Sequence, residues 1–473
     1  MKSSGMNLIV QIIMESETGQ RAQQVARLER QTTCLENVGL TLAEGKQLLA
    51  ALQAQMVEEQ ISEYLDRHRR CDQCGEVRTH KGAHDLTFQT LFGNLQLKSP
   101  RWKHCGCNPH EAKSFSPLAE LLTEHVSPER LYLETKWGSL IAFGPAANLL
   151  EDTLPITETV NANTVRNHLH HVAQRAEDEL GEEQGSFIEG CPRDWAGLPR
   201  PPAPITVGID GGYVRQWEDK KAHFEVIVGK SMPEEGAACR FGFVQTYDEK
   251  PKRWVFEVLK GQCMQCNQSV TFLSDGGDDV REVQQYLSLE SEHYLDWFHI
   301  TMRITVMKQM ANGLPISTGG AEVTTNRPKI EEELQLLKWN LWHGNVSRAL
   351  ERVEELQLDL ETVDESENRP KLRRALREFE IYIKNTRAFI PNFGERYRNQ
   401  EQISTAFVES TVNQVISKRM VKQQQMQWSK KGTHLLVQMR TKVLNNELEG
   451  LFRRWYPHFR IATNGGQEQT AAA

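Results

Sequence analysis

The spacing of hydrophobic positions changes several times along this chain, and each change predicts a different kind of element. Across residues 18–70 apolar side chains recur at helical spacing with few glycines or prolines, which predicts a helical N-terminal arm. Its heptads are not sustained, so a plain packing helix is favoured over a coiled coil. Residues 71–107 alternate apolar and polar positions, as hairpin strands do, and residues 117–190 return to helical spacing.

From residue 205 the pattern becomes that of a β-sheet. Ile205–Asp210 reads as a buried strand ending at Asp210, with a tight turn at Gly211 and Gly212. The same order returns at residues 269–277, where an apolar run ends at Asp275 and two glycines follow. Further elements are predicted as strands at Ala222–Gly229, Cys239–Tyr247 and His293–Phe298 and as a helix at Asp279–Leu287.

The repeated strand–Asp–Gly–Gly order suggests that two carboxylates meet at one edge of a sheet. Carboxylates held that close repel each other, and a bound divalent cation is the usual way to offset the repulsion. The sequence therefore suggests a Mg²⁺ (or Mn²⁺) site at Asp210 and Asp275. Two ordinary turns explain the same residues, and the repeat alone does not decide between these interpretations.

A basic helical segment follows a charged helical stretch at residues 300–400. Ser404 or Thr405 can cap a helix on which Glu409, Asn413 and Ser417 share one polar face. A functional interpretation of Glu409 requires this helix to lie across the sheet beside the two aspartates. His299, at the expected end of a strand, is a candidate to bond a phosphate or orient a carboxylate, although a lone histidine is more often structural.

Four cysteines bracket the predicted hairpin as Cys71-x-x-Cys74 and Cys105-x-Cys107. Two thiolate pairs held together by a hairpin can close a tetrahedral Zn²⁺ site, so a structural zinc is favoured over free thiols. His80, His84, His104 and His110 lie close enough in sequence to replace one cysteine.

Charge and composition change this picture only locally. The formal net charge is −7, but residues 401–460 carry ten basic and four acidic side chains, an excess typical of a partner-binding end. No apolar run is long enough to span a bilayer, no secretion signal is recognised, and the cysteine usage suggests a reducing cytoplasm.

Long strings in the chain resemble bacterial insertion-sequence transposases of the ISKra type. They include IDGGYVR, FEVIVGKS, FGFVQTYD, FLSDGGDDVR, LDWFHITMR, FIPNFGERYR and STAFVESTVNQVISKRM, and the match runs from about residue 70 to 460. The resemblance implies an RNase H-like DDE transposase of α/β class, with a mixed sheet, an all-helical insertion, and a zinc β-ribbon and helical DNA-binding segments before it. Its acidic triad carries over onto Asp210, Asp275 and Glu409, and its aspartate-x-x-histidine signature onto Asp296 and His299.

The resemblance and the patterns together predict eight segments. They are a helical arm (1–70), a zinc ribbon (71–116), a helical DNA-binding segment (117–190), a linker (191–204), the first part of the catalytic core (205–310), a helical insertion (311–400), the last part of the core (401–460) and a disordered tail (461–473).

The expected activity is Mg²⁺-dependent cleavage at insertion-sequence ends and transfer of the 3′-OH into target DNA. The partners are double-stranded DNA and a second copy of the chain, in a homodimer or larger assembly located at the bacterial nucleoid in the cytoplasm. An inactive zinc-ribbon regulator and a nuclease without strand transfer are the alternatives. The residues expected to hold DNA phosphates are Arg101, Lys103, Lys418, Arg419, Lys422, Lys430 and Lys431.

Overall fold

The structure is a computed structural model of the 473-residue chain, and its placed residues divide into two compact units. One unit comprises residues 1–174 and 446–473, and the other comprises residues 175–445. Within the described residues, no helix is both long and apolar enough to cross a membrane. The structure describes residues 6–16, 19–30, 34–107, 114–156, 160–182, 197–199, 201, 204–219, 221–265, 267–277, 291–314, 327–361, 367–421 and 427–461.

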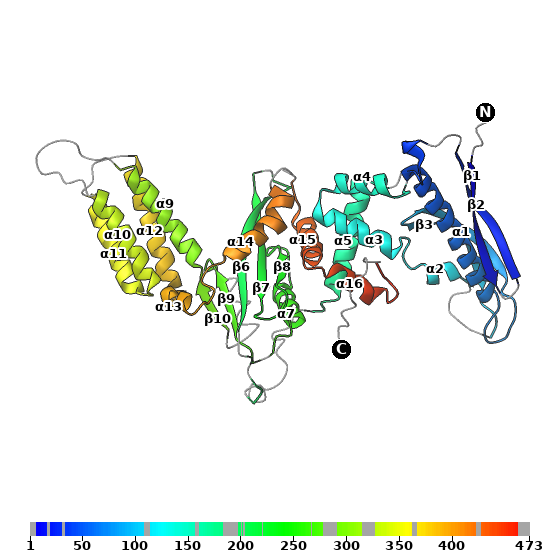
Figure 1. The fold of residues 1–473 in the computed structure, drawn as a ribbon. Coiled ribbons are helices and arrows are strands. Elements are labelled where there is room, and N and C mark those ends of the chain that lie inside the picture. The colour runs from blue at the N-terminus through cyan, green and yellow to red at the C-terminus, as the bar shows by residue number, and fades with distance from the viewer. Residues whose placement is uncertain are drawn as a thin grey trace, which may run out of the picture. The chain divides into compact units, whose positions relative to one another are not determined.

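The N-terminal arm is only partly helical, which corrects the sequence-based prediction for residues 1–70. Strand β1 (Met6–Ser16) pairs antiparallel with strand β2 (Gly19–Arg30), and helix α1 begins only at Leu42 (Figure 1). The Ala-, Gln- and Arg-rich composition of β2 favours a helix, but pairing with the β-branched residues of β1 overrides that preference. A capping box between Thr41 and Glu44 fixes where the helix starts.

The remainder of the first unit consists of a short ribbon followed by helices. Strands β3 and β4 form an antiparallel hairpin, and β5 pairs with the end of β4. Tyr132 and Phe452 pack edge to face with ring centroids 5.4 Å apart, which attaches α16 to α3. Residues 446–461, predicted to be part of the core, therefore fall in the first unit. The bounds are η1 (Leu35–Asn37), α1 (Leu42–His68), β3 (His80–Thr90), β4 (Gly93–Lys103), β5 (Ser114–Phe115), α2 (Pro117–Leu121), α3 (Pro128–Leu140), α4 (Phe143–Thr153), α5 (Ala162–Asp178) and α16 (Leu448–Trp455).

The second unit is built on a mixed five-stranded sheet of order β10-β9-β6-β7-β8 (Figure 1). Strands β6, β7 and β8 are antiparallel neighbours, while β9 and β10 run parallel to β6. A strand is present at each of the five positions that the sequence predicts. The strands are β6 (Ile205–Arg215), β7 (His223–Met232), β8 (Cys239–Phe243), β9 (Val270–Ser274) and β10 (Glu292–Leu295).

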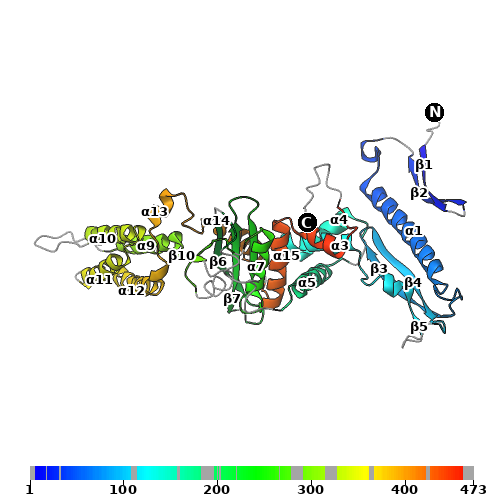
Figure 2. The same cartoon turned by 90° about the horizontal axis from the view of Figure 1, so that it is seen from below.

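Helices cover both faces of this sheet. On one face, α7 (Pro251–Gly261) packs Val255 and Leu259 against Val207, Ile209 and neighbouring apolar side chains. On the other face lie α14 (Ala406–Val412), the π-helix η3 (Asn413–Val421) and α15 (Lys430–Leu444), as Figures 1 and 2 show. Because strand side chains alternate between faces, Gly208, Asp210 and Gly212 all point toward α14 and η3.

Two sequence-based predictions about this sheet are wrong in detail, and one helix beside it was not predicted. Strand β6 does not end at Asp210 but continues to Arg215, since its glycines allow close packing and form no turn. Helix α7, between β8 and β9, was not predicted. Strand β10 ends at Leu295, so His299 lies in the first turn of α9 and not at the end of a strand. The helix predicted at Asp279–Leu287 lies outside the described residues, as do most of the linker, Lys422 and nearly all of the C-terminal tail.

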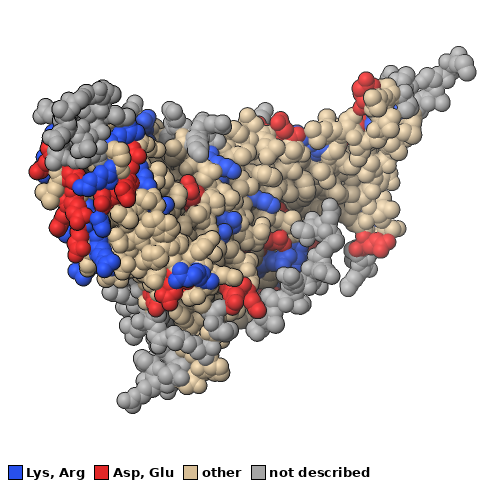
Figure 3. Space-filling model, turned by 60° about the vertical axis from the view of Figure 1, so that its left-hand side comes forward, with Lys and Arg blue, Asp and Glu red and all other residues tan. Residues whose placement is uncertain are grey.

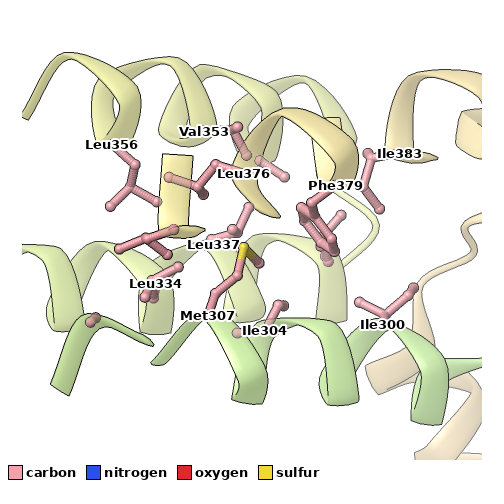
Figure 4. Close-up of a cluster of buried hydrophobic side chains, with 14 of the residues drawn as sticks. Ile300, Ile304, Met307, Leu334, Leu337, Val353, Leu356, Leu376, Phe379 and Ile383 are labelled. Atoms are coloured by element: carbon pink, nitrogen blue, oxygen red, sulfur yellow. The ribbon is translucent and has the colours of Figure 1, made fainter. Parts of the chain in front are cut away.

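The described helices within residues 297–398, where the sequence predicts a helical insertion, share one apolar core. Figure 4 shows side chains of α9, α10, α11 and α12 meeting in this core, among them Met307, Leu337, Val353 and Phe379. The insertion continues directly from β10, so its first helix starts earlier than the predicted boundary at residue 311. The bounds are α9 (Trp297–Asn312), α10 (Arg327–Trp342), α11 (Val346–Glu361), α12 (Asn368–Thr386), η2 (Arg387–Phe389) and α13 (Phe393–Arg398).

Two adjacent leucines of α10 provide a matched test of this core. Leu337 is 0% exposed and Leu336 is 37% exposed, so their truncations differ in the cavity that each leaves. We expect Leu337→Ala to lower the free energy of unfolding by about 2–5 kcal/mol and Leu336→Ala by much less. Urea unfolding of the full chain measures both, and equal losses would contradict the packing described.

Candidate active site and metal centre

The strand register places three aspartates at the same level across the parallel part of the sheet. Gly208 pairs with Leu273 on β9, and Ser274 pairs with Leu295 on β10. Continuing these registers puts Asp210, Asp275 and Asp296 side by side. The carboxyl ends of β9 and β10 thus meet the middle of β6, which is where the repeated strand–Asp–Gly–Gly order predicts that Asp210 and Asp275 come together.

The charges of the other two aspartates act on the pKa of Asp210. Burial raises the pKa of the Asp210 carboxyl, and the charges of Asp275 and Asp296 raise this pKa further. A hydrogen bond from the backbone N–H of Gly211 and the nearby His299 act in the opposite direction. Asp275 is exposed, so this group of acids is open to solvent on one side.

Helix α14 lies directly over Asp210. A Cβ atom added to Gly208 would come within 2.3 Å of Val408, and one added to Gly212 would come within 2.9 Å of Ile416. Asp210 sits between these two glycines on the same face of β6, so α14 and the start of η3 follow this part of the strand. Glu409 follows the packed Val408, and its side chain is exposed. Helix α14 thus lies on the face of β6 that carries Asp210, but Glu409, Asp210 and Asp275 are not among the described groups whose ligand atoms all lie within 4.8 Å of one another.

Asp296 fixes the start of α14 from the end of the sheet. Its fully buried carboxylate accepts hydrogen bonds from the backbone N–H of Phe298, at 2.8 Å, and from the hydroxyl of Thr405. His299 Nε2 lies 3.6 Å from Asp296 Oδ2. The Thr405 hydroxyl, which the sequence suggested as a helix cap, bonds Asp296 and caps no backbone N–H of α14. Asp296 thus holds the N-terminal end of α14 in place through Thr405.

The helical insertion supports Asp275 through Tyr382, a contact that the sequence does not reveal. The Tyr382 hydroxyl donates to the backbone carbonyl of Asp275 at 3.0 Å. Burial raises the pKa of Tyr382, and the guanidinium of Arg303 lies 4.2 Å from the centre of its ring. Helix α12 therefore holds the backbone at the end of β9.

The Thr405–Asp296 contact can be tested with an isosteric change that removes the hydroxyl and a smaller residue that keeps it. Thr405→Val removes the hydroxyl and leaves a buried carboxylate oxygen unpaired, which we expect to cost about 1–3 kcal/mol of stability. Thr405→Ser keeps the hydroxyl and should retain most of this stability. Chemical denaturation of both variants measures the difference, and a loss in Thr405→Val no larger than that in Thr405→Ser would contradict a dominant role for the hydrogen bond.

The four cysteines converge into one cluster at the base of the β3–β4 hairpin. Their sulfur atoms all lie within 4.8 Å of one another, and Cys105 Sγ is 3.1 Å from Cys71 Sγ and 2.8 Å from Cys107 Sγ. None of the four forms a disulfide. Tetrahedral Zn–S bonds of about 2.3 Å place sulfur atoms roughly 3.8 Å apart, so the cluster has the donor set and the size to hold a zinc ion.

Local backbone structure brings the first cysteine pair together. Gly75 adopts a φ of +71°, and its N–H donates to the carbonyl of Cys71 at 2.9 Å, which closes a tight turn around the thiols. A hydrogen bond from the Cys105 thiol is the main reason that the pKa of Cys71 is lowered to about 6. Because all four ligands are cysteines, no histidine is needed. His104 instead packs on Phe115, with ring centroids 4.6 Å apart.

The residues predicted to hold phosphates fall into two groups. Arg101, Lys103, Lys418 and Lys431 are exposed, and Lys430 is half-buried. Arg419 is fully buried, with its guanidinium 5.2 Å from the centre of the Trp428 ring, and burial lowers its pKa to about 10. The prediction that Arg419 holds a surface phosphate is therefore wrong, because its side chain packs inward from η3. Basic and acidic side chains are interspersed on the face shown in Figure 3.

Glu177, Asp248 and His434 form a second cluster of potential metal ligands. The tautomer of His434 does not suit metal binding. The three side chains lie within 4.8 Å of one another. The backbone N–H of Val244 donates to His434 Nδ1 at 3.3 Å, so the proton of the neutral ring is on Nε2 and points to Glu177. Neither ring nitrogen then has a lone pair for an ion, and the cluster connects α5 to α15 by a hydrogen bond.

Comparison with known proteins does not assign this chain to a family. No protein-family model matches its sequence, and a search of curated proteins found no match.

Proposed function

We propose that this chain is a DDE transposase with an RNase H-like core. Its activity would be Mg²⁺-dependent cleavage at insertion-sequence ends, followed by strand transfer of the new 3′-OH into target DNA. The observation that carries the proposal is the position of Asp210, level with Asp275 on the neighbouring parallel strand and beneath the helix that bears Glu409. The strand order, with three antiparallel strands followed by two parallel ones, supports the same fold.

We propose that the three acids hold the pair of metal ions that two-metal phosphoryl transfer uses. Asp210, Asp275 and Glu409 are not among the described groups whose ligand atoms all lie within 4.8 Å of one another. In a two-ion site the metals are about 3.5–4 Å apart, so only a bridging carboxylate touches both. Asp210, Asp275 and Glu409 are the residues that would hold the metal ions.

Each residue then has a defined part in the reaction. Mg²⁺ would supply charge that activates the attacking water or 3′-OH and stabilises the leaving oxygen. Asp210 must be ionised to bind, and the nearby His299 favours that form. Thr405 and Asp296 hold the start of the helix that bears Glu409, and Tyr382 holds the backbone at Asp275. Both steps are in-line displacements, for which fixed positions matter most.

DNA would be held by the exposed basic residues and by α5. Lys418 follows Glu409 along the same helical segment, and Lys430 and Lys431 begin α15. The N-terminal part of α5 exposes Asn163, Arg166 and Asn167. We propose that this helix and the zinc ribbon, through Arg101 and Lys103, read the terminal repeats, and that two chains assemble on paired ends.

A cleavage and joining assay tests the proposal. The purified chain is incubated with labelled duplexes carrying the DNA that flanks its gene, together with a target plasmid, in Mg²⁺ or in EDTA. We expect Mg²⁺-dependent cuts that leave a 3′-OH, and products joined to the plasmid. Binding without cleavage would indicate a regulator, and cleavage without joined products would indicate a nuclease.

A further inference from the structure

We propose that the outer edge of strand β1 pairs with the same strand of a second copy of this chain, so that two hairpins form one continuous four-stranded sheet. This dimer would form without DNA. The dimer depends on the N-terminal hairpin alone, so a test of the dimer does not depend on whether the chain is a transposase.

The first reason is that β1 is an edge strand without the usual protection. In the part of the chain that the structure describes, β1 pairs only with β2, and α1 packs against β2. Natural edge strands are usually guarded by lysine, proline or a bulge. The eleven residues of β1, MNLIVQIIMES, contain no lysine and no proline, and Glu15 is their single charge. The irregularity in the hairpin falls on β2, where Val25 has no partner residue.

The second reason is the apolar surface that the hairpin leaves uncovered. Four apolar side chains of β1 are more than a third exposed: Met6, Leu8, Ile9 and Ile13. Ile9 and Ile13 lie on one face of the strand, and Leu8 lies on the other. A two-stranded hairpin is marginally stable by itself, and a sheet of more strands is the ordinary way to stabilise one.

The third reason, which identifies the partner, is that β1 is self-complementary. An antiparallel pairing centred on Gln11 places Ile9 opposite Ile13, Val10 opposite Ile12, and Leu8 opposite Met14 of the other copy. Glu15 then faces the neutral Asn7, so no like charges meet. Moving the centre by one residue in either direction places a polar residue opposite an apolar one, as Asn7 opposite Ile13 or Glu15 opposite Ile9. A two-fold axis through Gln11 therefore suits this strand.

Cross-linking tests the register directly. In the proposed pairing the two Gln11 side chains face each other with Cβ atoms about 4.5–5.5 Å apart, close to the distance that a disulfide requires. We expect Gln11→Cys to give a disulfide-linked dimer under mild oxidation in the absence of DNA. The matched control is Gln23→Cys on β2, which should cross-link no faster than the unmodified chain with its native cysteines. Equal cross-linking of the two variants overturns the proposal.

Sedimentation of the full chain without DNA tests the interface energetically. Ile13→Lys introduces a charge twice in the dimer, opposite Ile9 of each partner, and should raise the dissociation constant roughly tenfold or more. Gln23→Lys places the same charge on β2 and should leave the dissociation constant unchanged. Ile13 is 58% exposed, so its replacement leaves the folded chain intact. A monomeric wild-type chain, or a dimer that Ile13→Lys does not weaken, overturns the proposal.

Discussion

Asp210→Asn is expected to reduce Mg²⁺-dependent cleavage by at least about 10³-fold while leaving binding to end DNA unchanged. Asparagine has the same shape but carries no charge, so it fills the space under α14 without binding two cations. Asp210 lies level with Asp275 on the neighbouring strand and on the face of β6 that α14 covers. Single-turnover cleavage and electrophoretic binding of the same preparation measure the two quantities.

The control for this experiment is Glu218→Gln. Glu218 is an exposed acid just beyond the end of β6, and its replacement removes the same charge from the same region of the chain. It should cleave at the wild-type rate. Wild-type cleavage by Asp210→Asn would remove Asp210 from the site, and loss of binding along with cleavage would show that the substitution disturbs the fold.

Cys71→Ser should have the largest effect on stability in the first unit. Cys71 is the buried member of the cysteine cluster, and its sulfur contacts both Cys105 and Cys107. Binding of a structural zinc is part of the folding free energy, so loss of one ligand should remove roughly 3–5 kcal/mol and lower the melting temperature of this unit by about 10 °C. Zinc content and differential scanning calorimetry measure the two effects.

Cys34→Ser is the matched control for the cluster. Cys34 is an exposed cysteine of the same unit that is not a member of the cluster, so its replacement should retain both the zinc and the melting temperature. If the wild-type chain purified in the presence of zinc contains none, or if Cys71→Ser melts as the wild type does, the cluster has no structural ion.

The chemistry-bearing residues were more predictable than the elements that carry them. Asp210 and Asp275 could be paired from sequence because each follows an apolar run and parallel strands end at a common edge. That β6 continues past Asp210 could not be predicted, because two glycines in succession are typical of a turn. In the structure these glycines allow close packing, because Ile416 lies directly against Gly212.

Long-range contacts and context-dependent elements account for the other differences. Thr405 and Asp296 are 109 residues apart, and no local pattern links them. Strand β2 has a helix-favouring composition and becomes a strand only because β1 lies beside it. The same limit applies to Arg419, which belongs to a basic segment by sequence but is turned inward to pack on Trp428. Local sequence gives the residue types, and the tertiary fold decides which of them face solvent.

Diffraction from the full chain bound to end DNA with Mn²⁺ in place of Mg²⁺ tests the central claim most directly. The account predicts two anomalous peaks about 3.5–4 Å apart, with Asp210 touching both and Asp275 and Glu409 each touching one. The absence of peaks at Asp210, or a metal site that Glu409 does not reach, would contradict it.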